Sequence, residues 1–167
     1  MKIGIILLCI LPFVLAGCKN KISVCSCNNI TSEHYQPNYG MEWTDQPDGL
    51  LFHKDGAGCK RELTCYKGSF TYFESNWIDT TIPPPDYADD TGVKILSQDL
   101  ETYSIGPYVE LQELFGIVCE NSKWVITKYP FGFSYMKKGT GEEIQIPGEE
   151  MTSKTYKTFV KKFYCDG

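Results

Sequence analysis

The sequence contains 167 residues, of which 42% are hydrophobic and 22% are charged, and its formal net charge is −5. This length fits one domain or a domain with a small annex. The apolar fraction is too high for a disordered chain and too low for a protein with many membrane spans. The acidic balance argues against a nucleic-acid partner, and eight cysteines indicate an oxidising, extracellular compartment.

The N-terminal segment, residues 1–17, is expected to be a secretory signal peptide. One basic residue precedes an apolar run over 3–15, and the small residues Ala16 and Gly17 follow it. The run is shorter than the roughly 20 residues that cross a bilayer, and Pro12 interrupts it. The alternative is a buried N-terminal strand or helix.

The end of this segment has two interpretations. Residues 15–18, Leu-Ala-Gly-Cys, resemble a bacterial lipobox, in which Cys18 would carry a lipid and anchor the protein to a membrane surface. Ordinary cleavage after Ala16 would instead release the protein. We expect no membrane contact unless Cys18 is lipidated.

Six further cysteines are the disulfide candidates: Cys25, Cys27, Cys59, Cys65, Cys119 and Cys165. An even number allows three bridges in fifteen connectivities, among which the sequence does not choose. A bridge between Cys25 and Cys27 would be strained, so we expect these two to tie the N-terminal arm to two different places. A metal site at this pair, with His34, is the alternative, but the pair lacks the Cys-x-x-Cys spacing of zinc sites. We therefore predict no metal and no cofactor.

The sequence predicts an arm and a body within one domain. Residues 18–58 form a cysteine-containing arm with loops, because the segment after Cys27 is rich in Asn, Gln, Pro and Gly. Asn29 begins the one glycosylation sequon, in a polar stretch where we expect it to be exposed. Residues 59–167 form the β-rich body.

Short strands with turns between them are predicted along this body. Residues 60–74 are predicted to form a hairpin that turns at 67–68. Residues 80–92 contain three consecutive prolines and are not expected to form a central strand. A short strand over 93–96 follows.

The second predicted hairpin joins 114–119 to 124–127 through a turn, and a strand over 131–136 precedes a turn-rich loop at 139–148. The last segment, 152–165, has apolar residues at helical spacing but is rich in β-branched and aromatic residues, which favours a strand over a helix. The predicted fold class is mostly β: a small antiparallel sandwich or barrel-like sheet with long loops, stabilised by disulfides.

No catalytic residue is predicted. The two histidines, His34 and His53, lie in turn-rich stretches without a nucleophile motif. Asp86, Asp89 and Asp90 belong to a proline-flanked loop that we expect to be solvated, rather than to a carboxylate pair or a calcium site. A pocket that holds either histidine beside a carboxylate would favour a hydrolase.

Charge is unevenly distributed along the chain. Residues 74–120 contain ten acidic residues and one lysine, whereas 121–167 contain eight lysines and five acidic residues. We interpret the segments as two solvated faces of one domain, and the alternative is self-association through opposed patches.

The three tryptophans are expected to be structural. Trp124 follows Cys119 closely and is expected to pack in the core against a disulfide. Trp43 and Trp77 lie in loop-like segments, and we expect them to fold over the core as a lid. An exposed aromatic binding surface is the alternative.

Three stretches carry a resemblance: DGAGCKRELTCYKG at 55–68, IVCENSKWVITK at 117–128, and the terminal FYCDG. Together they resemble nematode secreted cysteine-containing domains of unknown function, of the DUF two-eight-one type and its six-cysteine relatives. The resemblance implies a signal-bearing extracellular β-rich module without known catalytic residues, although Cys25-Ser26-Cys27 departs from the expected pattern. It also weakens the lipobox interpretation, because animal secretion does not lipidate Cys18.

We therefore expect a secreted, non-enzymatic domain that binds an extracellular protein or a glycan or belongs to a matrix. The first alternative is a bacterial surface lipoprotein anchored through Cys18, and the second is an extracellular hydrolase.

Overall fold

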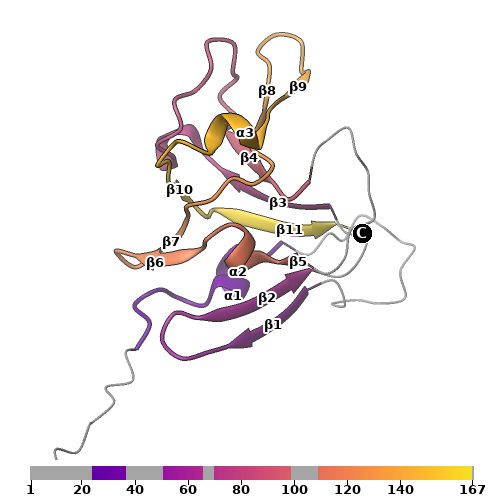
Figure 1. The fold of residues 1–167 in the computed structure, drawn as a ribbon. Coiled ribbons are helices and arrows are strands. Elements are labelled where there is room, and N and C mark those ends of the chain that lie inside the picture. Colours follow the sequence, from indigo (N-terminus) through magenta and orange to yellow (C-terminus); the bar gives the residue numbers. More distant parts are fainter. Residues whose placement is uncertain (1–23, 37–50, 66–69, 99–108, 167) are drawn as a thin grey trace, which may run out of the picture.

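A computed structural model describes residues 24–36, 51–65, 70–98 and 109–166 (Figure 1). The predicted signal peptide, Cys18 and Trp43 lie outside the described residues. Four helical turns are described: α1 (Ile30–His34), the 3-10 turn η1 (Trp77–Asp79), α2 (Leu111–Leu114) and α3 (Gly148–Met151). None of these helices has the length and apolar character needed to span a bilayer.

The largest sheet has five antiparallel strands, and Figure 1 shows it in the upper half of the molecule. In spatial order these are β11 (Lys162–Asp166), β3 (Phe70–Ser75), β4 (Val93–Leu96), β8 (Phe133–Met136) and β9 (Glu143–Ile146). Their register aligns Phe163, Phe73, Ile95 and Phe133 in one row, and each of these side chains is buried. This apolar row is the face that the sheet turns toward the core.

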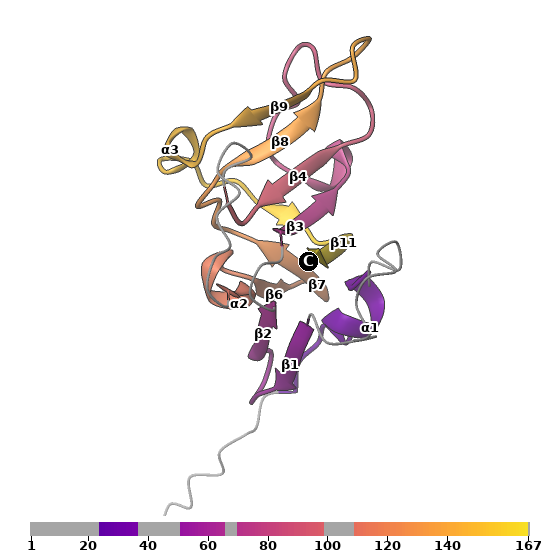
Figure 2. The ribbon, with the colours of Figure 1, turned by 90° about the vertical axis from the view of Figure 1, so that its right-hand side faces the viewer.

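The remaining strands form two smaller sheets (Figure 2). One has the order β1 (Leu51–Asp55), β2 (Arg61–Cys65) and β5 (Val109–Glu110), and the other has the order β10 (Thr158–Phe159), β7 (Lys123–Ile126) and β6 (Val118–Glu120). All three sheets are open, and none that the described residues form closes into a barrel. The predicted mostly β, antiparallel, disulfide-stabilised fold is confirmed.

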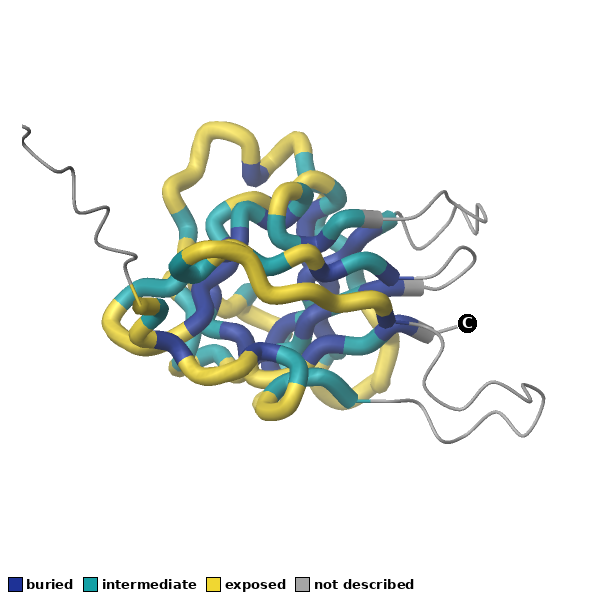
Figure 3. The backbone as a smooth tube through the Cα atoms, turned by 90° about the horizontal axis from the view of Figure 1, so that it is seen from below, coloured by how far each residue is buried: buried dark blue, intermediate teal, exposed yellow. Residues whose placement is uncertain are grey.

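One hydrophobic cluster contains residues of all three sheets, and Figure 3 shows these buried stretches at the centre of the fold. Phe73 packs edge-on against Phe115 and stacks on Phe163. Trp77 covers part of this core, because its ring contacts Phe133 and its indole N–H donates to the Asp89 carbonyl oxygen (2.8 Å). Trp77 therefore forms the predicted lid.

Several elements agree with their predictions. The hairpin of β6 and β7 and the strand β4 are present. The segment predicted as one C-terminal strand instead contains two, β10 and β11, which belong to different sheets. The segment 80–92 contains turns and bends, in agreement with its three prolines.

The hairpin predicted for 60–74 is wrong. β2 pairs with β1 and β5, whereas β3 pairs with β4 and β11, so the two halves of the segment belong to different sheets. β2 instead forms a hairpin with β1, the strand just before it, and β3 pairs with strands later in the chain.

Two further expectations are wrong. Instead of extending over 114–119, the strand begins at Val118, after α2 has ended at Leu114. The stretch predicted as a turn-rich loop at 139–148 contains β9, because its glycines flank the strand instead of interrupting it.

Candidate functional site

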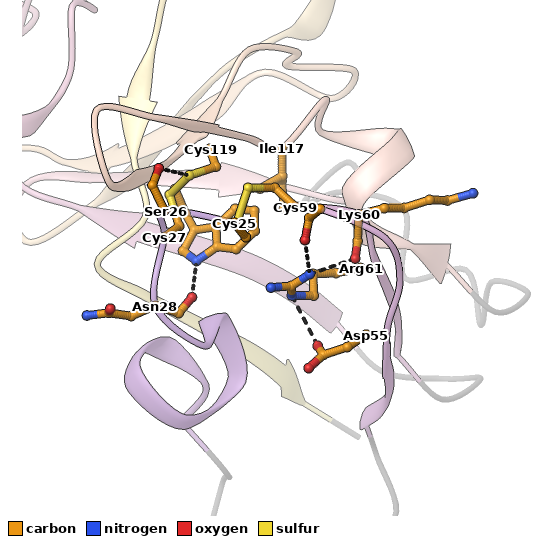
Figure 4. Close-up of a disulfide and its surroundings, with 12 residues drawn as sticks. Cys25, Ser26, Cys27, Asn28, Asp55, Cys59, Lys60, Arg61, Ile117 and Cys119 are labelled. Carbon is orange, nitrogen blue, oxygen red and sulfur yellow. Dashed lines mark hydrogen bonds and ion pairs between the residues drawn. A yellow bond between two sulfur atoms is a disulfide. The ribbon is translucent and has the colours of Figure 1, made fainter. Parts of the chain in front are cut away.

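The N-terminal arm is fixed to the body by two disulfides. Cys25 pairs with Cys59 and Cys27 pairs with Cys119, while the third bridge, Cys65–Cys165, joins β2 to β11. The arm is thus tied to two places, and these places are adjacent: the sulfur atoms of Cys25, Cys27 and Cys119 all lie within 4.8 Å of one another (Figure 4). Two of these three sulfurs are bonded to each other and the third belongs to the Cys25–Cys59 bridge, so the trio forms disulfides.

Arg61 lies beside this disulfide cluster (Figure 4), and its guanidinium group lies over the ring of Trp124. The guanidinium carbon lies 5.4 Å from the centre of the indole ring, a cation–π distance. Nη1 of Arg61 donates to the carbonyl oxygens of Gly58 (3.1 Å) and Lys60 (2.8 Å), which flank Cys59. Trp124 is 2% exposed and stands opposite Cys119 in the β6–β7 hairpin. Trp124 therefore has the predicted place in the core beside a disulfide.

Asn29 is the N-cap residue of α1. Its side-chain oxygen accepts hydrogen bonds from the backbone N–H groups of Thr31 (3.0 Å) and Ser32 (3.1 Å) and from the Thr31 hydroxyl (2.6 Å). The residue is exposed, and it uses its oxygen for the cap while its amide nitrogen makes no hydrogen bond to a described residue. The sequon therefore has both an exposed position and a structural role.

A pocket of about 200 Å³ lies on the surface near Trp124 and contains His34. Its wall includes the aromatic ring of Phe159, with the Lys123 ammonium 4.6 Å from the ring centre. Asp79 also lines it and forms an ion pair with Lys161 (3.1 Å). Aromatic and charged groups thus meet in one open concavity.

His34 has a defined tautomer in this pocket. Nδ1 lies 3.0 Å from the carbonyl oxygen of Lys161, and a carbonyl oxygen only accepts, so Nδ1 carries the proton. Nε2 lies 3.9 Å from a carboxylate oxygen of Glu33. Among the described residues, no hydroxyl or thiol hydrogen-bonds to His34. His34 therefore shares its pocket with the carboxylates of Glu33 and Asp79, but no nucleophilic side chain among the described residues is hydrogen-bonded to it.

A second, larger pocket of about 360 Å³ lies over the polar face of the five-stranded sheet. The register aligns Lys162, Glu74, Lys94 and Ser134 across four strands, so the charge alternates over the first three. Lys94 forms an ion pair with Glu143 (3.3 Å), which also accepts from the Ser134 hydroxyl (2.8 Å). Lys94 and Glu143 therefore compensate each other's charge in this pocket.

The remaining candidates stay apart from both pockets. His53 is exposed on β1, and Asp86 and Asp90 are exposed in their loop. The Asp89 carboxylate accepts from the backbone N–H of Thr91 (2.9 Å), a bond that shapes the turn. The aspartates therefore agree with the expectation of a solvated loop, whereas the turn-rich stretch predicted around His53 is wrong, because His53 lies in a strand.

The two oppositely charged segments pair with each other. Asp79 binds Lys161, Glu120 binds Lys157 (2.7 Å), and Lys94 binds Glu143. The charge asymmetry along the sequence is therefore partly neutralised within the fold.

The comparisons with known proteins give one family. The model of the family described as TRA-1 regulated protein R03H10.4 matches residues 23–165, a range that contains all six disulfide cysteines. The chain belongs to this family. No curated protein and no solved structure matches the chain. The TRA-1 regulated protein family fits the nematode cysteine-rich domains of unknown function that the sequence resembles, although DUF two-eight-one is not the name that matches.

Sequence reasoning did not single out Arg61, Phe159 or Lys123. Arg61 is the one arginine of the chain, and it begins strand β2. Phe159 and Lys123 meet only through the pairing of β10 with β7, which joins distant segments. The one sequence signal for Arg61 is that it is the single arginine of the chain and follows Cys59 by two positions.

Proposed function

We propose that this chain is a secreted, disulfide-stabilised, non-enzymatic domain that binds an extracellular protein or glycan. The observation that carries the proposal is the use of all six described cysteines in three disulfides, a pattern typical of oxidising compartments. The family description names no enzymatic activity. A distant relation to the DUF two-eight-one type stays part of this proposal.

The secretory part of the proposal also draws on the N-terminal sequence and on Asn29. Residues 1–17 have the layout of a signal peptide, and the sequon asparagine is exposed at a helix terminus. A glycan on Asn29 would extend from the arm, whose position the two disulfides fix.

Expression of the full chain in animal cells tests secretion. We expect mature protein in the medium with its N-terminus near residue 17, a mass six hydrogens below the reduced value, and a mass decrease after removal of N-glycans. Retention in the cells with an uncleaved N-terminus would contradict the proposal. Expression of the same chain in bacteria tests the lipoprotein alternative, since diacylglycerol on Cys18 would establish the membrane anchor.

The pocket beside α1 is the proposed binding site. Its Phe159 ring offers an apolar platform, and Lys123, Lys161 and Asp79 offer hydrogen-bonding groups around it, a combination that suits a sugar or a polar peptide. A glycan array and a peptide array probed with the secreted protein test this proposal. We expect the signal to be lost in Phe159→Ala and kept in Tyr87→Ala, an exposed aromatic outside this pocket. Equal binding by both variants would place the site elsewhere.

An extracellular hydrolase is the second candidate, because His34 shares its pocket with Glu33 and Asp79. Hydrolysis of chromogenic esters or glycosides that is lost in His34→Ala would establish it. The same activity in wild type and variant would assign the turnover to a contaminant.

A further inference from the structure

We propose that the two adjacent disulfides of the arm form a thiol–disulfide exchange site, in which a thiolate freed at Cys25 attacks Cys119 and releases Cys27. The co-reactant is a thiol, either a small molecule or a cysteine of another protein. This chemistry is independent of the binding function proposed above.

The positions of the sulfur atoms favour exchange. The sulfur of Cys25 lies within 4.8 Å of both sulfurs of the Cys27–Cys119 bridge, whereas Cys59 is not a member of this close group (Figure 4). Thiol–disulfide exchange requires direct approach of a thiolate to a disulfide sulfur. Of the two sulfurs that opening of the first bridge would free, Cys25 is therefore the one next to a second bridge.

The first bridge is also the accessible one. Both of its cysteines, Cys25 and Cys59, are half-buried, whereas each of the other bridges has a buried cysteine: Cys27 is 7% exposed, and Cys65 and Cys165 are each 1% exposed. The Arg61 guanidinium donates to the carbonyl oxygens on both sides of Cys59, so a cation, itself ion-paired with Asp55, is held next to the backbone of Cys59 and favours the approach of a thiolate from that side. Attack at Cys59 makes Cys25 the leaving group.

The reaction then has two balanced steps. The external thiolate bonds to the Cys59 sulfur, the Cys25–Cys59 bond breaks, and its electron pair stays on Cys25. The Cys25 thiolate then bonds to the Cys119 sulfur, the Cys27–Cys119 bond breaks, and Cys27 takes a proton from water. Each step replaces one disulfide by another, so no oxidant is needed.

Attack at Cys119 is favoured over attack at Cys27. A Cys25–Cys27 bridge would span one intervening residue, which strains the ring. A Cys25–Cys119 bridge closes a loop two residues longer than the native 92-residue separation, so the loop entropy is nearly unchanged. The Ser26 hydroxyl lies 3.4 Å from the Cys119 sulfur and so helps to hold that sulfur beside the arm.

Two variants that remove the same bridge test the proposal. Cys59→Ser leaves a thiol at Cys25, inside the close group, and Cys25→Ser leaves a thiol at Cys59, outside it. Each purified protein is incubated at pH 8 without oxidant, quenched with acid, alkylated and mapped by mass spectrometry. In Cys59→Ser we expect the label to be divided between Cys25 and Cys27, in amounts within about tenfold of each other. In Cys25→Ser we expect it on Cys59 alone.

The wild-type protein gives a second measurement that requires no variant to fold. After incubation with reduced glutathione we expect a glutathione adduct on Cys59 and a free thiol on Cys27, with Cys65–Cys165 intact. Label on Cys25 alone in Cys59→Ser, or a free thiol on Cys25 alone in the treated wild type, would overturn the proposal.

Discussion

The guanidinium group of Arg61 lies over the indole ring of Trp124, at 5.4 Å from the ring centre, and joins two sheets that the chain forms from distant segments. Arg61 belongs to β2 and Trp124 to β7. The Arg61 side chain is 10% exposed, so its charge is largely removed from water and is compensated by the Asp55 carboxylate (3.1 Å) and by two backbone carbonyls. This contact therefore links the disulfide cluster to the core.

Substitution of Arg61 is expected to destabilise the fold. Arg61→Ala removes the cation–π contact and two charged hydrogen bonds, which together contribute about 2–3 kcal/mol. Arg61→Lys keeps the charge but loses the planar donor group, so we expect an intermediate loss. Urea unfolding followed by tryptophan fluorescence measures both losses.

Asp55→Asn is the matched control for the same ion pair. The Asp55 side chain is 62% exposed, and an ion pair with so exposed a partner contributes little, so we expect a change within about 0.5 kcal/mol. A loss as large as that of Arg61→Ala would show that the ion pair, and not the ring contact, is the main interaction.

The three disulfides are expected to differ in their contribution. Cys65 and Cys165 are separated by 100 residues, and removal of their bridge costs about 4.7 kcal/mol in loop entropy. Cys25 and Cys59 are separated by 34 residues, which corresponds to about 3.8 kcal/mol. Thermal unfolding of the two double Cys→Ala variants should therefore give the lower Tm for the Cys65–Cys165 pair. The reverse order of Tm values would mean that the packing of the arm contributes more to stability than the difference in loop entropy.

Local signals account for the elements that the sequence predicted. The β6–β7 hairpin pairs residues within eight positions of the chain, and its turn residues Asn121 and Ser122 both have positive φ (51° and 62°). Such a two-residue turn imposes the register of its strands, so the pattern of neighbouring residues is sufficient. β4 and the C-terminal strand likewise follow from β-branched and aromatic runs.

Distant pairings account for the errors. β2 and β3 are neighbours in sequence, but β3 finds its partners in β4 and β11, which lie later in the chain. The disulfide connectivity has the same origin, since it depends on which strands become neighbours and not on the spacing of the cysteines. The candidate pocket combines residues of α1, η1, β7 and β10, and no local pattern joins these four segments.

Two glycines with positive φ differ in the space available for a side chain, and they allow a matched test of its effect on stability. Gly132 (φ +75°) has the Ile146 carbonyl oxygen where a Cβ would stand, whereas Gly139 (φ +86°) has nothing within 4 Å. Gly139→Ala should cost only the strain of a left-handed backbone, about 1–2 kcal/mol. Gly132→Ala should cost at least about 3 kcal/mol, because β9 must also move away from β8. Equal losses in urea unfolding would mean that β9 shifts at little cost.

Tyr129 gives the fold a dependence on alkaline pH. Burial raises the pKa of its hydroxyl from 10.0 to about 12, and a hydrogen bond with Thr158 opposes this shift. Because the folded-state pKa is the higher one, the folded protein retains a proton that the unfolded chain loses, so stability is fully present below pH 10 and falls between pH 10 and 12. By pH 11 this group should account for a loss of about 1.4 kcal/mol.

Tyr129→Phe isolates this contribution from those of the other tyrosines. The variant loses the hydrogen bond to Thr158 and should be less stable by about 1 kcal/mol at pH 7. Its further loss between pH 7 and pH 11 should be smaller than that of the wild type by about 1.4 kcal/mol. Identical pH profiles in urea unfolding would show that another group titrates.

The cap formed by Asn29 can be separated from its sequon. Asn29→Asp keeps an oxygen that accepts from the N–H groups of Thr31 and Ser32, but it cannot carry an N-linked glycan. Asn29→Ala removes both functions and should cost about 1 kcal/mol in urea unfolding of glycan-free protein, whereas the Asp variant should equal the wild type. Protein secreted from animal cells should lose its glycan in both variants. A glycan that persists in Asn29→Asp would have to be attached elsewhere, since the sequence contains no second sequon.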